Sequence, residues 1–339
     1  MQQILLIYTG GTIGMVKDAD SAFLKPFNFD NLLEQIPQLK SINANIDTLS
    51  VPYPKDSADM LPKDWQFLGQ MIFDHYKSYD GFVVLHGTDT MSYTSTALSF
   101  MFENLKKPII FTGSQLPIGD VRTDALENVL TAIQIALLSK DGNPLITEVG
   151  LFFDNKLFRA NRSVKVNSSQ FNAFNSPNYR ALIVSGVSLK VDESALLKCD
   201  FSKETSFSSK LNSNVFLLKI HPGIDEKMFK SLCEKVNFEI LILESYGSGT
   251  IFTAEWFLES IVKLRQCKKI VINCTQCIEG GVVANMYESS YMLKEAKVLN
   301  SKDMTTESVL AKSMILLGHN DAFLAFKKEF EVSFSGELS

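Results

Sequence analysis

The chain has 339 residues, 45% of them hydrophobic and 21% charged, with a formal net charge of −5 at pH 7. These values are typical of a globular protein long enough for two domains, and the scattered basic residues exclude an obvious nucleic-acid or anionic-membrane surface. The first apolar run covers only residues 4–8, too short for a signal peptide, and no segment approaches the roughly 20 apolar residues of a membrane span, so we expect a cytoplasmic protein without a membrane or nucleic-acid partner.

Strand-like apolar runs alternate with helical segments in the first half of the chain, which predicts a parallel sheet covered on both faces. The expected strands are 3–8, 46–51, 81–85, 109–112, 149–153 and 181–184, and the expected helices are 63–78, 92–105 and 122–139. The chain then becomes polar and serine-rich, and after it three more apolar runs follow at 215–218, 239–243 and 269–273.

This pattern predicts an α/β protein of two domains. We expect an N-terminal catalytic domain over 1–185 with a larger, doubly wound, mostly parallel sheet. A polar segment that cannot bury a core is typical of a surface linker, which we place at 186–214. A smaller C-terminal α/β domain is expected over 215–339.

Two short glycine turns follow the strands expected at 3–8 and 81–85. The first reads Thr9-Gly10-Gly11-Thr12 and the second reads His86-Gly87-Thr88-Asp89-Thr90. Glycine permits positive φ and close backbone approach, so each motif predicts a tight turn at a strand end. Because open α/β sheets bind ligands at the carboxyl ends of their strands, we expect both turns to face one crevice.

The side chains at these turns indicate possible nucleophilic chemistry. The Thr12 hydroxyl is a weak nucleophile near neutral pH and needs a base or a polarising neighbour. Lys165 is a candidate for that neighbour if it is buried close by, and Asp89 could orient it or bind a substrate ammonium group. Taken singly, Thr12 and Asp89 also fit helix caps, and Lys165 fits a solvated surface charge. Only the coincidence of two glycine turns favours the chemical interpretation.

No metal or cofactor is expected. The five cysteines form an odd set without framework spacing, so we expect reduced thiols, and the C-x-x-C at Cys274 and Cys277 lacks the further ligands that zinc needs. The first turn does not have the G-x-G-x-x-G spacing of a dinucleotide site. His86 fits a structural imidazole that stabilises its turn better than a catalytic group.

The two turns, extended to Thr9-Gly10-Gly11-Thr12-Ile13-Gly14 and Leu85-His86-Gly87-Thr88-Asp89-Thr90-Met91, resemble the two signatures of the bacterial L-asparaginase family, in particular its type I cytoplasmic branch. Residues 56–60, 111–117, 159–165 and 172–178 resemble the same branch. The resemblance runs from about residue 3 to the C-terminus and is densest before the expected linker. It implies an amidohydrolase that converts L-asparagine to L-aspartate and ammonia.

The resemblance implies a catalytic role for four residues. Thr12 matches the primary threonine, which attacks the side-chain amide carbon or assists attack on it. Thr88, Lys165 and Asp89 match a hydrogen-bonded triad that activates a hydroxyl or water. Whether the reaction passes through an acyl-enzyme or by direct displacement stays open.

The resemblance also implies how the substrate is bound. Asp89 and Ser57 match residues that hold its α-amino and α-carboxylate groups, together with Gly11, Gly87 and Thr88. Backbone N–H groups near Ser57 and Gly87 suit the carboxylate.

Three positions depart from the family pattern. Phe23 stands where a loop tyrosine normally contacts the nucleophilic threonine, which predicts a slower enzyme. Glu244 and Val164 stand where an arginine and a threonine are common near an asparagine-binding allosteric site. A reversed charge would repel a bound carboxylate, so we expect that allosteric mode to be lost.

The family implies self-association as a homodimer or homotetramer, and the preference for asparagine over glutamine stays open. A glutaminase-type subunit of a tRNA transamidation complex would normally carry an extra N-terminal domain, whereas this chain begins at its first strand. A non-catalytic amino-acid sensor is favoured only by Phe23.

Overall fold

The computed structural model describes residues 1–17, 24–26, 36–283, 288–319 and 323–339, which form two compact units, Met1–Ser209 and Lys210–Ser339. The break between the units falls inside the segment 186–214, where a linker is expected. Part of that segment, β15 (Leu189–Val191), pairs into the sheet of the first unit. Ordered chain of the first unit therefore continues beyond residue 185.

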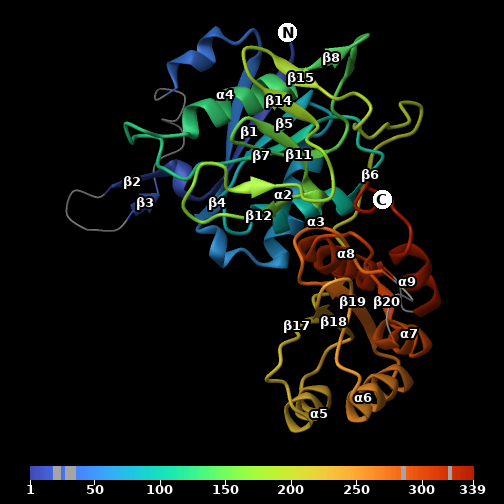
Figure 1. Ribbon diagram of the computed structural model, residues 1–339. Coiled ribbons are helices and arrows are strands. Elements are labelled where there is room, and N and C mark those ends of the chain that lie inside the picture. Colours follow the sequence, from blue (N-terminus) through green and yellow to red (C-terminus); the bar gives the residue numbers. More distant parts are fainter. Residues whose placement is uncertain (18–23, 27–35, 284–287, 320–322) are drawn as a thin grey trace. The chain divides into compact units, whose positions relative to one another are not determined.

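The first unit is built on an eight-stranded sheet (Figure 1). Its order is β15-β14-β11-β10-β7-β5-β1-β4. The strands are β1 (Gln3–Gly10), β4 (Asn45–Lys55), β5 (Gly81–Leu85), β7 (Ile109–Thr112), β10 (Val149–Phe153), β11 (Lys156–Arg159), β14 (Ile183–Ser185) and β15. The run from β4 to β10 is parallel, and β11, β14 and β15 add antiparallel pairs at one edge. The prediction of a larger, mostly parallel sheet is confirmed.

Strand β11 was not among the strands that the sequence predicts. It follows β10 through a tight hairpin in which Asp154 and Asn155 both have positive φ, 44° and 66°. Asp and Asn tolerate this conformation better than other non-glycine residues, so the chain can reverse between two short apolar runs.

Helices cover both faces of this sheet (Figure 1). The helix α4 (Ala125–Ala136) packs its apolar face against strand residues such as Leu6 and Val83. Helices α2 (Pro62–His75) and α3 (Met91–Met101) lie on the other face. Because strand side chains alternate, Thr9 at the end of β1 faces α2 and α3.

Short elements complete the first unit. The paired strands are β2 (Met15–Lys17) with β3 (Leu24–Pro26), β6 (Phe102–Glu103) with β16 (Ser206–Phe207), β8 (Ser139–Lys140) with β9 (Asn143–Pro144), and β12 (Val164–Lys165) with β13 (Phe174–Asn175). The 3-10 turns are η1 (Thr12–Gly14), η3 (Pro37–Ser41), η4 (Ser57–Asp59) and η5 (Ala160–Arg162).

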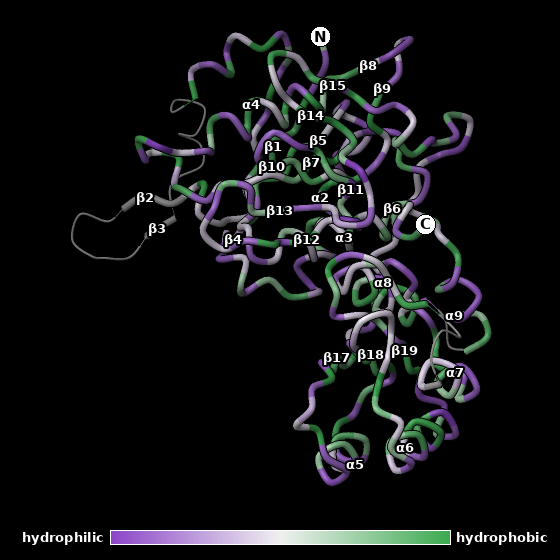
Figure 2. The backbone as a smooth tube through the Cα atoms, viewed as in Figure 1, coloured by the Kyte–Doolittle hydropathy of each residue, from purple (hydrophilic) through white to green (hydrophobic). Residues whose placement is uncertain are grey.

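The second unit is built on a smaller four-stranded parallel sheet, which confirms the predicted smaller α/β domain and adds β20 to the three expected strands. The strands, in spatial order, are β17 (Val215–Lys219), β18 (Ile240–Ser245), β19 (Ile270–Thr275) and β20 (Leu299–Asn300). The helices are α5 (Glu226–Lys235), α6 (Glu255–Gln266), α7 (Glu288–Glu295), α8 (Thr306–His319) and α9 (Phe323–Phe330). Figure 2 shows hydrophobic and hydrophilic residues on the same turns of α5 and α6, as expected of helices with one buried side. Within the described ranges, no helix combines the length and apolarity that crossing a lipid bilayer requires.

A buried ion pair stabilises the C-terminal end of the second unit. The Lys312 ammonium on α8 lies 2.5 Å from Glu337 Oε1, and both side chains are 0% exposed. The same ammonium donates hydrogen bonds to the carbonyl oxygens of Phe330 (2.9 Å) and Val332 (2.7 Å). Burial lowers the pKa of Lys312, and the Glu337 carboxylate opposes that effect.

Candidate active site

The two glycine turns meet. Gly10 and Gly11 have φ of +119° and +87°, and a Cβ on Gly11 would overlap the backbone of Gly87. A Cβ on Gly87 would in turn lie 2.6 Å from the Ser57 hydroxyl oxygen. The ends of β1 and β5 and the turn after β4 therefore pack directly on one another, which only residues without a side chain allow.

We expect Gly11→Ala to lower the free energy of unfolding of the first unit by at least about 1–2 kcal/mol, because an L-residue is strained at this φ and its Cβ overlaps Gly87. Urea denaturation would measure the change. The matched control is Gly119→Ala, where a Cβ meets nothing within 4 Å. Equal stability of the two variants would contradict the close approach.

Lys165 joins two residues of the second turn. Its Nζ donates to Thr88 Oγ1 at 2.7 Å and to Asp89 Oδ1 at 2.6 Å. The side chain of Lys165 is 17% exposed, whereas that of Asp89 is 62% exposed. A largely buried ammonium therefore bonds a buried hydroxyl and a carboxylate that reaches solvent.

A second buried ion pair lies just before Lys165 in the chain. Arg159 Nε donates to Glu148 Oε2 at 2.6 Å, with side-chain exposures of 4% and 2%. Arg159 also donates to the Ala195 carbonyl at 2.8 Å, and its guanidinium lies 4.5 Å from the Tyr179 ring centroid. These contacts fix the start of the segment that runs through η5 to β12, where Lys165 pairs with Phe174.

Ser57 lies beneath the second turn. Its hydroxyl accepts from the Asp89 backbone N–H at 3.2 Å, and its carbonyl accepts from Thr90 Oγ1 at 2.6 Å. Asp56 caps the turn η4 by accepting from the Ala58 backbone N–H at 2.9 Å. These bonds hold Ser57, which is 2% exposed, against the backbone that carries Thr88 and Asp89.

Thr12 is the first residue of η1 and is half-buried. It follows Gly11, whose backbone packs on Gly87 of the second turn. Among the described residues it has no hydrogen bond to Thr88, Asp89 or Lys165. The structure thus joins Thr88 and Asp89 through Lys165, whereas Thr12 is connected to them only through the packing of its neighbour Gly11 on Gly87.

Gln115 is a further residue of this cluster that sequence reasoning did not single out. Its Oε1 lies 3.4 Å from Thr88 Oγ1, and its backbone N–H donates to Asp124 Oδ2 at 3.0 Å. Gly113 and Gln115 follow the end of β7 just as the two glycine turns follow β1 and β5. That repeated strand-end position is the signal by which Gln115 could have been found.

The surroundings of His86 fit a structural role in its turn. It is fully buried, its Nδ1 lies 2.7 Å from the Gly87 carbonyl oxygen, and burial lowers its pKa to about 4. The imidazole is therefore neutral near pH 7. This supports the structural alternative for His86.

The positions that depart from the family pattern lie in different places. Phe23 falls outside the described residues. Val164 lies in β12, paired with Asn175. In the second unit, Glu244 Oε1 accepts from Thr306 Oγ1 at 2.9 Å and Oε2 lies 3.7 Å from the Lys219 ammonium.

All five cysteines are free thiols, with Cys274 buried and Cys277 exposed.

The fold and the cluster define an α/β enzyme that gathers hydroxyl groups, a lysine and a carboxylate at the ends of parallel strands. Residues 3–196 match the family model described as the N-terminal domain of asparaginase, and residues 214–330 match the glutaminase/asparaginase C-terminal domain. The chain belongs to the asparaginase family, so the resemblance seen in its sequence is confirmed.

Several known proteins are similar to this chain over nearly its whole length. L-asparaginase 1 of Escherichia coli is 34% identical over 347 residues, covering 100% of this chain and 98% of that protein. The crystal structure of L-asparaginase I from Vibrio cholerae matches with a TM-score of 0.89 and 35% identity, covering 100% and 99% of the two chains. The thermostable L-asparaginase from Thermococcus kodakarensis matches with a TM-score of 0.90 and 32% identity, covering 99% of each chain.

Proposed function

We propose that this enzyme hydrolyses the side-chain amide of L-asparagine to L-aspartate and ammonia, with Thr12 as nucleophile. The observation that carries the proposal is the Lys165 ammonium between Thr88 (2.7 Å) and Asp89 (2.6 Å). Family membership and the full-length similarity to the enzyme named L-asparaginase 1 support the choice of substrate.

The substrate's charged groups find partners around the glycine turns. The α-ammonium would bind the exposed carboxylate of Asp89. The α-carboxylate would accept hydrogen bonds from Ser57 and from backbone N–H groups at Gly11 and Gly87, because consecutive N–H groups in tight turns form anion-binding concavities. Bound in this way, the substrate would direct its side-chain amide toward Thr12.

The proposed chemical steps use the bonds of Lys165 to Thr88 and Asp89 and require that Thr12 approaches Thr88 when substrate is bound. Thr12 Oγ forms a bond to the amide carbon as its proton passes to Thr88, whose own proton moves to Lys165 while Asp89 takes one from the ammonium. Return of a proton to the nitrogen breaks the C–N bond and releases ammonia. Water then attacks the ester, which regenerates Thr12 and leaves aspartate.

Ammonia release tests the proposal. Purified protein should produce ammonia from asparagine, and Thr12→Ala should remove nearly all of it, whereas Thr253→Ala at an exposed threonine should not. The same assay with glutamine measures the preference between the two amides. Ammonia release by Thr12→Ala equal to that of the parent would exclude Thr12 as nucleophile.

We expect Phe23→Tyr to raise kcat for asparagine by about 10–100-fold, because a phenolic hydroxyl beside the nucleophile assists its proton transfer. The expectation rests on the match of residue 23 to the family's loop tyrosine. Steady-state kinetics would measure kcat, and Phe27→Tyr is the matched control. An unchanged kcat would show that the residues bonded to Lys165 suffice for activation.

We also propose that asparagine does not activate this enzyme from a second site. The support is Glu244, whose carboxylate stands where a carboxylate-binding arginine is common and is bonded to Thr306 at 2.9 Å. We expect a hyperbolic dependence of rate on asparagine concentration. A sigmoidal dependence at constant oligomeric state would contradict this proposal.

For assembly and location, we propose a homodimer or homotetramer in the cytoplasm. Support for self-association comes from the family resemblance, and the five free thiols fit a reducing compartment. Light scattering coupled to size-exclusion chromatography would give the mass in solution. A monomer that is fully active would contradict the proposed assembly.

A further inference from the structure

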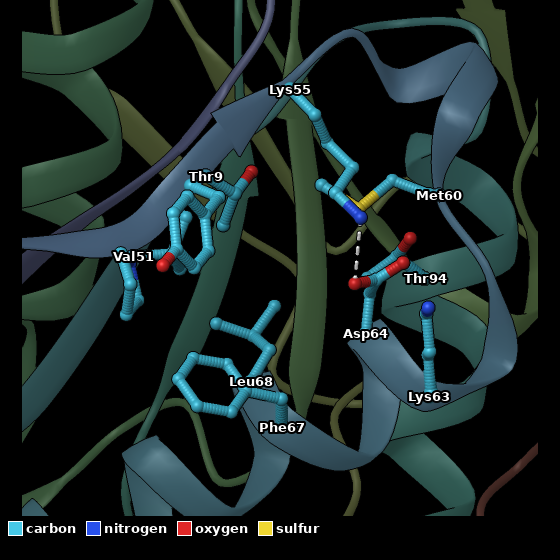
Figure 3. A pocket seen from close by; sticks show the side chains of 11 residues that line it. Thr9, Val51, Lys55, Met60, Lys63, Asp64, Phe67, Leu68 and Thr94 are labelled. Atoms are coloured by element: carbon cyan, nitrogen blue, oxygen red, sulfur yellow. Dashed lines mark hydrogen bonds and ion pairs between the residues drawn. The ribbon is translucent and has the colours of Figure 1, made fainter.

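A cavity of about 420 Å³ lies between the end of β4, helix α2 and helix α3, on the face of the sheet that carries Thr9 (Figure 3). It is lined by Thr9, Val51, Pro52, Tyr53, Lys55, Met60, Lys63, Asp64, Phe67, Leu68 and Thr94. This volume lies in the range of small-molecule sites, which are about 300–1,000 Å³. None of these residues belongs to the group around Lys165.

The wall of the cavity is mostly apolar and partly open to solvent. Figure 3 shows Phe67 and Leu68 pointing from α2 toward Thr9 and Val51. Phe67 is 48% exposed and Tyr53 is 84% exposed, although both are large hydrophobic residues. Two aromatic side chains beside a concave apolar surface provide area that an apolar ligand can cover.

The charges of the cavity are unequal. Lys55 Nζ lies 2.8 Å from Asp64 Oδ1, so these two charges compensate each other. Lys63, one residue before Asp64 on the first turn of α2, has no ion-pair partner among the described residues. Two lysines and one aspartate give the lining a formal charge of +1. The uncompensated charge of the lining is therefore positive.

One lining residue also carries an unsatisfied polar group in the wall of the cavity. Thr94 on α3 is 1% exposed, and within the described part of the chain its hydroxyl has no hydrogen-bond partner. A buried hydroxyl without a partner costs about 1–3 kcal/mol.

We propose that this cavity binds an amphipathic organic acid, that is, a carboxylate attached to an aromatic or aliphatic body. The apolar body covers Phe67, Leu68 and Tyr53, and the carboxylate pairs with Lys63. Because the lining excludes Thr12, Thr88, Asp89 and Lys165, such a ligand binds together with the amino-acid substrate and does not compete with it.

Calorimetry with 4-phenylbutyrate, 4-phenylbutanol and 4-phenylbutylamine tests the proposal on the full chain. These probes share one apolar body and differ in charge, and we expect the acid to bind most tightly. Lys63→Met should weaken binding of the acid about 10-fold, the effect of losing one charged hydrogen bond, and leave the alcohol unchanged. The matched control Lys77→Met, at an exposed lysine after α2, should change neither.

Two further measurements locate the ligand. Phe67→Ala should weaken both the acid and the alcohol, whereas Phe73→Ala, a 37% exposed residue on the same helix, should not. Saturating L-aspartate should leave binding of the acid unchanged. These readouts do not use catalysis, so they are independent of the proposed asparagine hydrolysis.

Three results would overturn the proposal. The first is equal affinity for the acid, the alcohol and the amine, which would remove the role of Lys63. The second is displacement of the acid by L-aspartate, which would place it at the substrate site. The third is the absence of binding combined with a lower mass in solution for Tyr53→Asp, which would show that a second copy of the chain covers the cavity.

Discussion

Lys165→Met is expected to lower kcat for asparagine hydrolysis by about 10²–10⁴-fold, the range by which a positioned acid–base group accelerates proton transfer. Methionine keeps most of the side-chain volume but removes the ammonium that donates to Thr88 at 2.7 Å and to Asp89 at 2.6 Å. Without it, the Thr88 hydroxyl has no route for its proton. Ammonia release under substrate saturation measures the effect.

The control for this variant is Lys156→Met, an exposed lysine on β11 that we expect to retain full kcat. Circular dichroism should show that both variants stay folded, since methionine keeps most of the volume of the Lys165 side chain, which is 17% exposed. A folded Lys165→Met protein with undiminished kcat would exclude the proposed proton path.

Lys312→Met is expected to lower the free energy of unfolding of the second unit by about 3–5 kcal/mol, because removing one partner leaves a buried charge uncompensated. Here the charge left behind is the Glu337 carboxylate, whose side chain is 0% exposed. The carbonyl groups of Phe330 and Val332 also lose their donor. The end of the chain after α9 should therefore separate from α8.

The two tryptophans make this effect measurable in one unit at a time, because Trp65 lies on α2 and Trp256 on α6. In a Trp65→Phe background, urea denaturation followed by fluorescence reports the second unit alone. Lys327→Met is the matched control, since its contact with Glu331 is 3.9 Å long and exposed, and such pairs contribute about 0–1 kcal/mol. Similar losses in both variants would contradict the importance of the buried pair.

Much of the fold could be predicted because its signals are local. Continuous apolar runs such as Gly81–Leu85 and Val149–Phe153 are strands in the structure over the same residues. Their alternation with helical segments indicated the parallel sheet. Strand β11 could not be found this way, because its pairing depends on a two-residue turn, and turn conformation is a weaker signal than hydrophobic periodicity.

The candidate site, like the fold, has features that the sequence predicted and features that it did not. The glycine turns predicted tight turns at two strand ends, and the family resemblance grouped Lys165 with Thr88 and Asp89. Their catalytic roles and the substrate contacts of Ser57 stay predictions. The proximity of Gln115 to Thr88 was not predicted, because it depends on how β7 lies beside β5.

The sequence by itself determined the α/β class, the family and the residue types available at the strand ends, because these follow from short-range patterns. Only the tertiary structure decided which side chains meet. The Lys165 bond to Thr88 spans 77 residues, the Lys312 ion pair joins α8 to the end of the chain, and the cavity near Lys63 is bounded by a strand and two helices. Contacts of this kind depend on chain segments that are distant in sequence, so no local pattern specifies them.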